Sequence, residues 1–338
     1  MKEKVILDPY FRKMANIFTP EDRQRLYTAA DVVWGKDEVM PEEEIEKVRG
    51  EAVALITGYW RHGDVARFPN LHAILEVGGG FPPLTSLDYP ACFARGIRVL
   101  SCAPAFGPAV AEMGLGLALA SARQIAWTDQ AFRGSEPHWS HTAFETEIGE
   151  PFTLYGKPVG FIGFGSLARA LKPLLEPFGC PIQAYDPWLT DIYLHRQGVT
   201  PVGLDALLSS SRVIFVLALP TASNKGMLSR EKLGLIRPDA VFVLLSRSHL
   251  VDFDALTEMV LAGRFRAAID VFPEEPLPRD HPIRQARHAV LTSHRAGAIG
   301  EGLLNIGRMV ADDIEAICRG LVPQALQAAQ PEFIRMRG

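Results

Sequence analysis

The sequence predicts an α/β protein of two domains, each built on a doubly wound parallel sheet. At 338 residues the chain is long enough for two hydrophobic cores. Short apolar runs alternate with helical patterns along most of its length. Near the middle, a glycine-rich turn joins a strand to a helix, as in sheets that bind ligands at the carboxyl ends of their strands.

The first third of the chain carries this alternation from the start. Thr19-Pro20 has the pattern of an N-cap followed by proline at the first helical position. Gly50 and Gly96 each follow a helical pattern and are expected to end it. The predicted strands are 5–7, 32–33, 52–56, 73–77 and 97–100, and further helices are predicted at 41–49 and 89–95.

A long helix, predicted at residues 108–126, links this region to a second one. Residues 133–156 lack periodicity and are predicted to form a loop. Further on, Asp252 is expected to cap a helix that Gly263 ends, and a final helix at 303–319 returns the chain to the first domain. The predicted strands of the second region are 159–162, 182–185, 213–217, 240–245, 267–269 and 290–292.

The central glycine turn has the features of a dinucleotide-binding turn. Gly163 permits the tight turn after the strand, and Gly165 lets the backbone approach a pyrophosphate closely. Ala168 is small enough for the following helix to pack against the sheet. The free N–H groups of Ser166 and Leu167 open that helix at the positive end of its dipole and point at an anion. The alternative interpretation is an ordinary glycine turn within a parallel sheet.

Asp186 indicates which dinucleotide is bound. It ends the next predicted strand, about eighteen residues past Ala168, where a carboxylate can accept the hydroxyls of an adenosine ribose. The same charge would repel a 2′-phosphate, and Pro187, Trp188 and Leu189 supply no arginine to receive one. The expected cofactor is therefore NAD rather than NADP.

Composition excludes several other functions. A net charge of −4 and the lack of any basic run argue against nucleic-acid binding. The apolar run at the N-terminus is too short for a signal peptide, and the apolar stretch 113–122 lies between Glu112 and Arg123 and is too short to span a bilayer. We expect a cytoplasmic protein with no membrane partner. The scattered cysteines favour free thiols over a disulfide frame or a metal site; they are Cys92, Cys102, Cys180 and Cys318.

Three polar residues follow strands of the second region and are candidates for catalysis. Arg247, Glu275 and His294 all belong to the edge where ligands bind in doubly wound sheets. Arginine binds a carboxylate bidentately and stays charged, which suits anchoring of a 2-oxo acid. Histidine suits proton transfer, and a nearby glutamate would orient it and raise its pKa. Taken singly, each has an ordinary role as a surface cation or a loop residue.

Over nearly its whole length the chain resembles the D-isomer-specific 2-hydroxyacid dehydrogenase family. The matching motifs, in order, are the Val110-Ala111-Glu112 helix, the Gly163–Asp186 turn, Ser246-Arg247 with Leu250-Val251-Asp252, Asp270-Val271-Phe272 leading to Glu274-Glu275-Pro276, and Thr292-Ser293-His294 with Gly297. The resemblance implies a flavodoxin-like substrate domain, a Rossmann NAD-binding domain and a cleft between them. It implies that the substrate domain is discontinuous, and we place it at residues 1–115 and 305–338, with the NAD-binding domain at 116–304. It also implies a homodimer.

The resemblance further implies roles for individual residues. Arg247 would bind the substrate, His294 would act as acid/base, and Glu275 would be its partner. Asp270 would lie near the nicotinamide amide. Beyond the glycine turn, the residues expected beside the cofactor are Ala218, Leu219, Leu245, Ser246, Asp270 and Gly297.

The chain departs from the family pattern close to two of these residues. Ser248-His249 stands where glycine is common, and serine would cost about 1 kcal/mol there if the backbone needed a positive φ. Ser293 and Arg295 flank His294 in place of proline and isoleucine. The connection at residues 78–86 is longer than usual. These departures predict intact chemistry and an altered pocket.

The substrate is expected to meet a glycine loop of the first domain. The backbone N–H groups of Val77, Gly78 and Gly79 are candidates for holding its carboxylate, the alternative being a flexible turn. Arg61 is a candidate for a second anionic group, such as a phosphate or distal carboxylate, although most exposed arginines only solvate a surface. Residues expected to cap the pocket, without binding metal, are His138, Trp139 and His141.

Together these observations predict an NAD-dependent oxidoreductase that interconverts a D-2-hydroxy acid and a 2-oxo acid. One alternative is a specialised reductase of hydroxypyruvate, glyoxylate or a phosphorylated 2-oxo acid, and activity that depends on Arg61 or Arg295 would indicate the last. A second alternative, from another class, is an NAD(H)-sensing binding module that keeps the fold without turnover.

Overall fold

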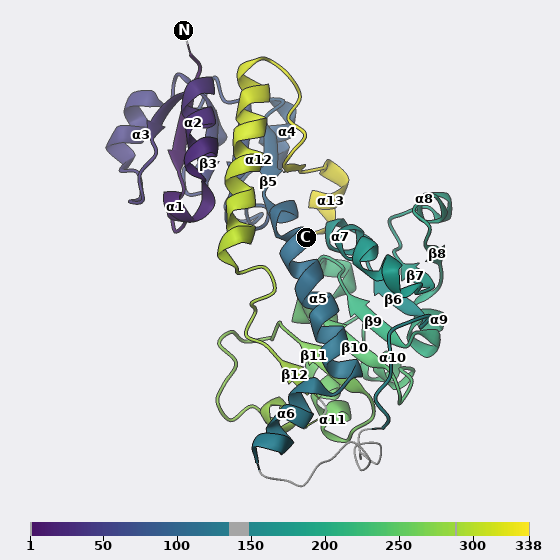
Figure 1. Cartoon of the computed structure of the whole chain (residues 1–338). Coiled ribbons are helices and arrows are strands. Elements are labelled where there is room, and N and C mark those ends of the chain that lie inside the picture. The colour runs from purple at the N-terminus through teal and green to yellow at the C-terminus, as the bar shows by residue number, and fades with distance from the viewer. Residues whose placement is uncertain (1, 135–148, 288, 338) are drawn as a thin grey trace. The chain divides into compact units, whose positions relative to one another are not determined.

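The structure is a computed structural model that describes residues 2–134, 149–287 and 289–337. It divides into two compact units, Met1–Gly107 with Gly297–Gly338, and Pro108–Ala296 (Figure 1). The chain crosses between them earlier than expected, after Gly107 instead of residue 115 and after Ala296 instead of residue 304. The expected pocket-capping residues His138, Trp139 and His141 lie outside the described residues.

The first unit contains a six-stranded sheet in the order β13-β5-β4-β3-β1-β2. All its pairings are parallel except that of β13 with β5. The strands are β1 (Lys4–Asp8), β2 (Asp31–Trp34), β3 (Ala52–Thr57), β4 (Ala73–Glu76), β5 (Arg98–Ser101) and β13 (Gln327–Ala328). Every residue of β3 and β4 is buried, as expected for central strands covered on both faces.

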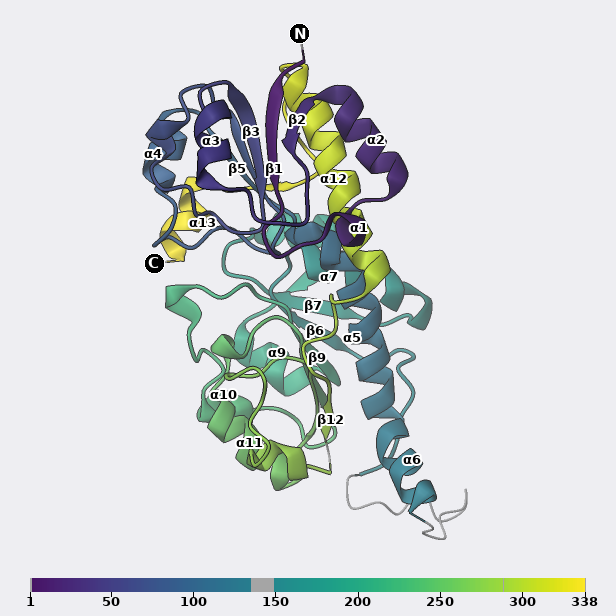
Figure 2. The ribbon, with the colours of Figure 1, turned by 90° about the vertical axis from the view of Figure 1, so that its left-hand side faces the viewer.

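Helices cover both faces of this sheet. α1 (Met14–Ile17), α2 (Pro20–Ala29) and α12 (Gly300–Cys318) pack over one apolar cluster, and α2 and α12 lie side by side in Figures 1 and 2. α3 (Glu42–Val48), α4 (Tyr89–Ala94) and α13 (Pro331–Met336) contribute to a second cluster. The predicted cap of α2 is present, because the Thr19 hydroxyl accepts from the Asp22 N–H at 3.0 Å.

The second unit contains a seven-stranded sheet in the order β12-β11-β10-β9-β6-β7-β8, with every pairing parallel. Its strands are β6 (Val159–Ile162), β7 (Ile182–Tyr185), β8 (Thr200–Pro201), β9 (Val213–Val216), β10 (Val241–Leu244), β11 (Arg266–Ile269) and β12 (Ala289–Leu291). The strand order reverses direction between β6 and β9, which is where doubly wound sheets open a ligand crevice. The two sheets confirm the predicted α/β class.

The helices of this unit include the predicted one capped by Asp252, whose carboxylate accepts from the Ala255 N–H at 3.0 Å. The described helices are α5 (Gly107–Ala122), α6 (Ile125–Arg133), α7 (Ser166–Leu175), α8 (Asp191–Arg196), α9 (Leu204–Ser210), α10 (Arg230–Gly234) and α11 (Phe253–Leu261). Short 3-10 turns complete the two units: η1 (Val65–Arg67), η2 (Ala103–Phe106), η3 (Glu176–Phe178), η4 (Ala222–Asn224), η5 (Ser248–Leu250) and η6 (Pro282–Gln285).

The predicted single helix at 108–126 is in fact two. Gln124 adopts a left-handed backbone with φ of 57°, which ends α5 and starts α6 in a new direction. With the preceding 3-10 turn, α5 forms a continuous stretch, Ala103–Ala122, that is long and apolar enough to cross a membrane by length and composition alone. The expectation concerned residues 113–122 alone, which form the second half of this longer stretch. Half of it is buried, and Gly114 lies so close to Leu245 that a β-carbon would sit 2.7 Å from that side chain.

His62 is a buried histidine of the first unit that packs among aromatic rings. Its ring lies 5.2 Å from that of Trp60 and 6.1 Å from that of Phe68, measured between centroids, and it is 1% exposed. Neither ring nitrogen has a hydrogen-bond partner among the residues that the structure describes. Burial, reinforced by the neighbouring positive charge of Arg61, lowers the pKa of His62 to about 4.

This histidine is expected to make the protein acid-sensitive. The folded-state pKa of His62 lies below the ordinary value near 6.5, so between these two values the unfolded chain binds a proton that the folded protein does not. The free energy of unfolding therefore keeps its full value above about pH 6.5 and falls as the pH drops toward 4. Between pH 7 and 4.5 the wild type should lose roughly 2–3 kcal/mol of stability that a His62→Phe variant keeps. Urea unfolding midpoints at both pH values measure this difference. Equal losses in the two proteins would contradict it.

Candidate active site

The glycine turn after β6 has the geometry that a dinucleotide requires. Gly163 has φ of 89°, and a β-carbon there would lie 2.6 Å from the Ala218 α-carbon, so only glycine fits. At Gly165 a β-carbon would meet nothing within 4 Å, so this side of the turn is open to a ligand. In the described part of the chain no side chain caps the first turn of α7, which leaves the N–H groups of Ser166 and Leu167 to bind an anion.

Asp186 is held beside this turn. One carboxylate oxygen accepts from the Phe164 N–H at 2.8 Å and the other from the Trp188 N–H at 3.0 Å. Each oxygen has a second lone pair, and the side chain is half-exposed, so the carboxylate can still accept ribose hydroxyls. The turn, the helix start and the acid together fit the adenosine end of an NAD(P) cofactor.

The other expected cofactor contacts differ in how accessible they are. Ala218 packs on Gly163 from the end of β9, and Leu219 after it is exposed. Leu245 and Ser246 follow β10 and are both buried, and the Ser246 hydroxyl has no hydrogen-bond partner among the described residues. Gly297 belongs to the first unit, where a β-carbon would come within 3.0 Å of the Phe106 ring. Their contact with the cofactor remains a prediction.

Arg247 lies three residues past the end of β10 and is exposed. Its guanidinium donates through Nη1 to the Ser246 carbonyl at 2.6 Å. The suspected strain after it is not present, because neither Ser248 nor His249 has a positive φ and both lie in the turn η5. The His249 ring nitrogen Nε2 is instead 2.9 Å from the Thr221 carbonyl oxygen, so this residue holds the loop in place.

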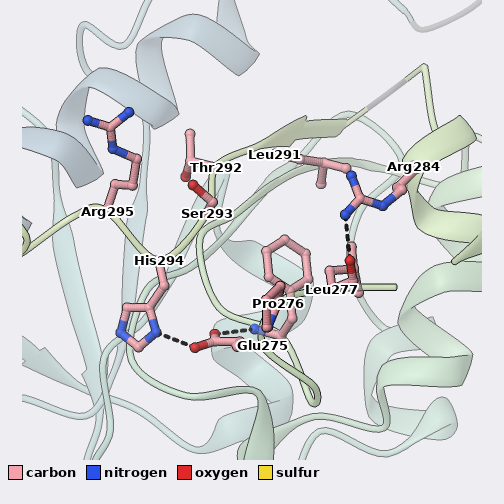
Figure 3. Close-up of a pocket in the computed structure, with 10 residues that line it drawn as sticks. Glu275, Pro276, Leu277, Arg284, Leu291, Thr292, Ser293, His294 and Arg295 are labelled. Atoms are coloured by element: carbon pink, nitrogen blue, oxygen red, sulfur yellow. Dashed lines mark hydrogen bonds and ion pairs between the residues drawn. The ribbon is translucent and has the colours of Figure 1, made fainter. Parts of the chain in front are cut away.

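His294 and Glu275 form a hydrogen-bonded pair (Figure 3). Nδ1 of His294 is 2.6 Å from one carboxylate oxygen of Glu275, and the other oxygen accepts from the Phe272 N–H at 2.9 Å. Burial acts to raise the pKa of Glu275, but the bonds from His294 and Phe272, together with the charge of Arg247, outweigh it and hold the pKa below its ordinary value. An ionised carboxylate therefore faces the imidazole and fixes its orientation.

Asp270 holds the loop that carries His294. Its carboxylate accepts from the Thr292 hydroxyl at 2.5 Å and from the N–H groups of Arg295 and Ala296 at 2.9 and 3.0 Å. Its carbonyl accepts from the His294 N–H at 2.8 Å. These bonds keep His294 at a φ of 51°, a conformation that non-glycine residues rarely adopt.

This arrangement adds a positioning role to the one expected for Asp270. The residue is 0% exposed, and its carboxylate holds the loop 292–296 through three hydrogen bonds. Its contact with a nicotinamide amide remains a prediction. This positioning role could not be predicted from local patterns, because the bonded groups lie more than twenty residues further along the chain.

A cavity of about 640 Å³ opens beside the His294–Glu275 pair, entirely within the second unit. Its apolar wall is formed by Phe272, Pro276, Leu277 and Leu291, and its polar lining by Glu275, Arg284, Thr292, Ser293, His294 and Arg295. Arg284 is engaged, since it donates to the carbonyls of Leu277 and Pro278 at 2.6 and 2.7 Å. Figure 3 shows Arg295 pointing away from His294.

The glycine loop of the first unit does not present its amides as expected. The Val77 N–H donates to the Thr57 carbonyl at 2.8 Å. Those of Gly78, Gly79 and Gly80 donate to the carboxylate of Glu76 at 2.8, 3.1 and 3.0 Å. Free amides for a substrate carboxylate were therefore a wrong prediction for this structure.

Glu76 is the residue that sequence reasoning missed. It is 5% exposed, and burial raises its pKa to about 7 although the three N–H donors of the glycine loop oppose that rise. The sequence feature that could have indicated this role is an acidic residue at the end of a buried strand, immediately before a run of glycines. A carboxylate in that position can reach the backbone N–H groups of the glycines that follow it.

Arg61 also has a structural partner. Its Nη2 donates to the carboxylate of Asp8 at 2.7 Å and to the Met40 carbonyl at 2.5 Å. Asp8 is fully buried, so this arginine neutralises a charge that would otherwise be costly. The suggestion that Arg61 binds a second anionic group of the substrate is not supported by this geometry.

Comparison with known proteins identifies the class. The sequence pattern described as D-isomer specific 2-hydroxyacid dehydrogenase, NAD binding domain, matches residues 115–296, more than half of the chain. The chain therefore belongs to the D-isomer specific 2-hydroxyacid dehydrogenase family, whose members act on small 2-oxo and 2-hydroxy acids, and its second unit is an NAD(P)-binding domain.

Three individual proteins show where the chain lies within this family. D-3-phosphoglycerate dehydrogenase of Mycobacterium tuberculosis is 31% identical over 265 residues, which cover 78% of this chain and 48% of that protein. Glyoxylate reductase of Korarchaeum cryptofilum is 28% identical over 310 residues, covering 89% and 90%. A crystal structure of a phosphoglycerate oxidoreductase from Rhizobium etli matches with a TM-score of 0.83 and 35% identity, covering 97% and 99%. The chain spans about half the length of the phosphoglycerate dehydrogenases that it matches.

Proposed function

We propose that the protein is an NAD-dependent dehydrogenase that interconverts a D-2-hydroxy acid and a 2-oxo acid. The observation that carries this proposal is the His294–Glu275 pair, 2.6 Å apart, at the carboxyl edge of the sheet that also carries the dinucleotide turn. An acid/base group and a cofactor turn on one sheet are what a hydride-transfer reaction coupled to proton transfer needs.

The residues divide the chemistry between them. When bound, NADH supplies the hydride. His294, protonated and stabilised by the Glu275 carboxylate, gives the proton to the oxygen that becomes the hydroxyl. Arg247 pairs with the substrate carboxylate and polarises the adjacent carbonyl through its fixed positive charge. Asp270 contributes indirectly, because it keeps the His294 loop in the conformation that aims the imidazole.

A panel of 2-oxo acids tests the proposal. NADH oxidation would be followed with glyoxylate, pyruvate, hydroxypyruvate, 2-oxoglutarate, phenylpyruvate and 3-phosphohydroxypyruvate. Turnover of at least one of them, giving the D-hydroxy acid by chiral chromatography, is the expected result. Tight NADH binding without turnover of any would instead favour an NAD(H)-sensing module.

The choice of NAD over NADP rests on the carboxylate of Asp186. In an Asp186→Ala variant we expect the ratio of kcat/KM for NADH over NADPH to fall by about tenfold or more, because the repulsion of a 2′-phosphate and the ribose contact disappear together. Parallel assays with both cofactors measure the ratio. Asp191→Ala is the control, since that exposed acid lies on α8, beyond the end of β7. An unchanged ratio in Asp186→Ala would refute the ribose contact.

A glyoxylate or hydroxypyruvate reductase is the second candidate. Its support is the 28% identity to a glyoxylate reductase, over nine-tenths of both chains. A phosphorylated substrate is less favoured, although relatives are called phosphoglycerate dehydrogenases, because Arg61 already neutralises Asp8. The same panel separates these candidates by their kcat/KM values.

A further inference from the structure

Arg266 is a buried cation at the edge of the seven-stranded sheet where the strands begin. It is the first residue of β11, so it lies at the opposite edge from the dinucleotide turn, and it is 4% exposed. Its guanidinium donates through Nη1 to the carbonyls of Ser121 and Ala122, each at 3.1 Å, and through Nη2 to that of Glu150 at 2.9 Å. All three acceptors are neutral oxygen atoms.

The charge of Arg266 has no counterion in the described part of the chain. Burial, and then the positive charge of Arg212, lower the pKa of Arg266 to about 10, so the side chain is still protonated at neutral pH. The guanidinium carbons of Arg212 and Arg266 lie 4.0 and 5.2 Å from the centroid of the Phe152 ring. Arg212 pairs with Asp239, whereas Arg266 keeps an uncompensated positive charge. Because a buried charge is costly without an opposite one, this position favours an anion.

A small pocket adjoins Arg266 where the end of α5 and the start of α6 meet β11 and β12 (Figure 1). We call it the amino-edge pocket. It lies entirely within the second unit and has a volume of about 20 Å³. No acidic residue is among the described residues that line it. Its polar lining is formed by Ser121, Gln124, Arg266 and Arg287.

Two donors of the amino-edge pocket are buried without a partner. The Ser121 hydroxyl and Nε of Arg266 make no hydrogen bond among the described residues. Ser121 is as buried as Arg266, at 4% exposed, so bulk water does not solvate either group. Buried polar atoms are nearly always hydrogen-bonded, to the protein, to an ordered water or to an ion. The two atoms therefore mark the position of a ligand.

The size and chemistry of the pocket select this ligand. A volume of about 20 Å³ admits one water-sized particle, which excludes phosphate, sulfate and carboxylates because each contains several heavy atoms. A metal cation does not suit a lining that has two guanidinium groups and, among the described residues, no acid. A water molecule would leave the charge of Arg266 uncompensated. A chloride ion accepts from N–H and O–H donors and supplies the opposite charge.

We propose that the amino-edge pocket is a chloride site, in which the ion accepts hydrogen bonds from Nε of Arg266 and the Ser121 hydroxyl and is attracted by the charge of Arg287. The site is separate from the proposed dehydrogenase chemistry, because it lies at the opposite edge of the sheet from the dinucleotide turn. The other N–H groups of Arg266 join β11 to the end of α5 and to Glu150. The bound ion therefore stabilises the junction of these segments.

Thermal unfolding tests the site in solution. The full chain would be unfolded in sodium chloride and in sodium gluconate at equal ionic strength, because gluconate is too large for the pocket and the screening of surface charges is then matched. We expect the unfolding midpoint to be about 2–4 °C higher in chloride. The rise should level off with increasing chloride concentration, as it does for a ligand that binds only the folded state.

Matched variants locate the effect. Ser121→Ala and Arg287→Gln each weaken the pocket's hold on an anion and leave the bonds of Arg266 to backbone carbonyls in place. We expect the double variant to lose the chloride-dependent rise. Arg123→Gln is the control, because that exposed arginine follows α5 directly and does not line the pocket. An equal rise in the wild type and the double variant, or no rise in the wild type, overturns the inference.

Anomalous diffraction places the ion without any substitution. Crystals of the wild type grown in sodium bromide should show a bromide peak within hydrogen-bond distance of the Ser121 hydroxyl and Nε of Arg266. A water at this position, with no anomalous signal, overturns the inference. A bromide peak together with an unfolding midpoint that chloride does not change means binding at crystal concentration only, and it also overturns the inference.

Discussion

Replacing His294 with asparagine is expected to lower kcat by about 10²–10⁴-fold while leaving NADH affinity nearly unchanged. Asparagine keeps a polar group beside Glu275 but cannot carry the proton that the imidazole transfers. The dinucleotide turn lies on other strands, and among the described residues none of the hydrogen bonds of that turn involves His294. The loss should therefore appear in turnover and not in cofactor binding.

Two measurements decide this prediction. NADH affinity is followed by fluorescence titration, and turnover is measured with the best substrate of the panel. His195→Asn is the matched control, because His195 is an exposed histidine of the same unit on α8. Turnover near the wild-type rate in His294→Asn would contradict the assignment of His294 as the acid/base residue.

Replacing Asp270 with alanine should damage both stability and turnover. Its carboxylate is the acceptor for the Thr292 hydroxyl and for the N–H groups of Arg295 and Ala296, and these donors would lose their partner. At about 1–3 kcal/mol for each buried donor left unsatisfied, the expected loss is roughly 3 kcal/mol or more. Because the loop would no longer hold His294 at its unusual φ, kcat should fall by about 10²-fold.

The pattern of effects distinguishes positioning from contact. If Asp270 acts through the loop, kcat and the unfolding midpoint fall together and the NADH dissociation constant changes little. If it touches the nicotinamide amide instead, NADH affinity falls by at least as much as kcat, and the positioning role is rejected. Glu274→Ala provides the control, since this exposed carboxylate lies in the segment between β11 and β12.

The parts of the site that follow strand ends were predictable from the sequence. Gly163, Asp186, Glu275 and His294 all come at the ends of apolar runs, and the topology of a parallel sheet puts such positions on one edge. The fold class was predictable for the same reason, because alternating strands and helices have few arrangements. These conclusions need only local patterns and the order of the elements.

What could not be predicted depends on contacts between distant segments. Arg61 looks like a free surface cation until Asp8, more than fifty residues earlier, is seen to be buried beside it. Asp270 shows no sign of holding the loop 292–296 until its carboxylate is seen to accept hydrogen bonds from that loop. The break of the long helix at Gln124 rests on one residue with a positive φ, for which glutamine gives no signal.

The carboxylate of Glu76 has a thermodynamic consequence for the glycine loop. Three consecutive glycines would ordinarily be the most disordered part of such a chain, and a ligand binding there would have to supply the free energy that orders them. Glu76 provides an internal acceptor for all three N–H groups, so the loop reaches its ordered state during folding. The entropy cost of ordering the loop therefore lowers the free energy of unfolding. A ligand that binds beside the loop does not have to supply that free energy, so its association constant is higher than it would be with a disordered loop.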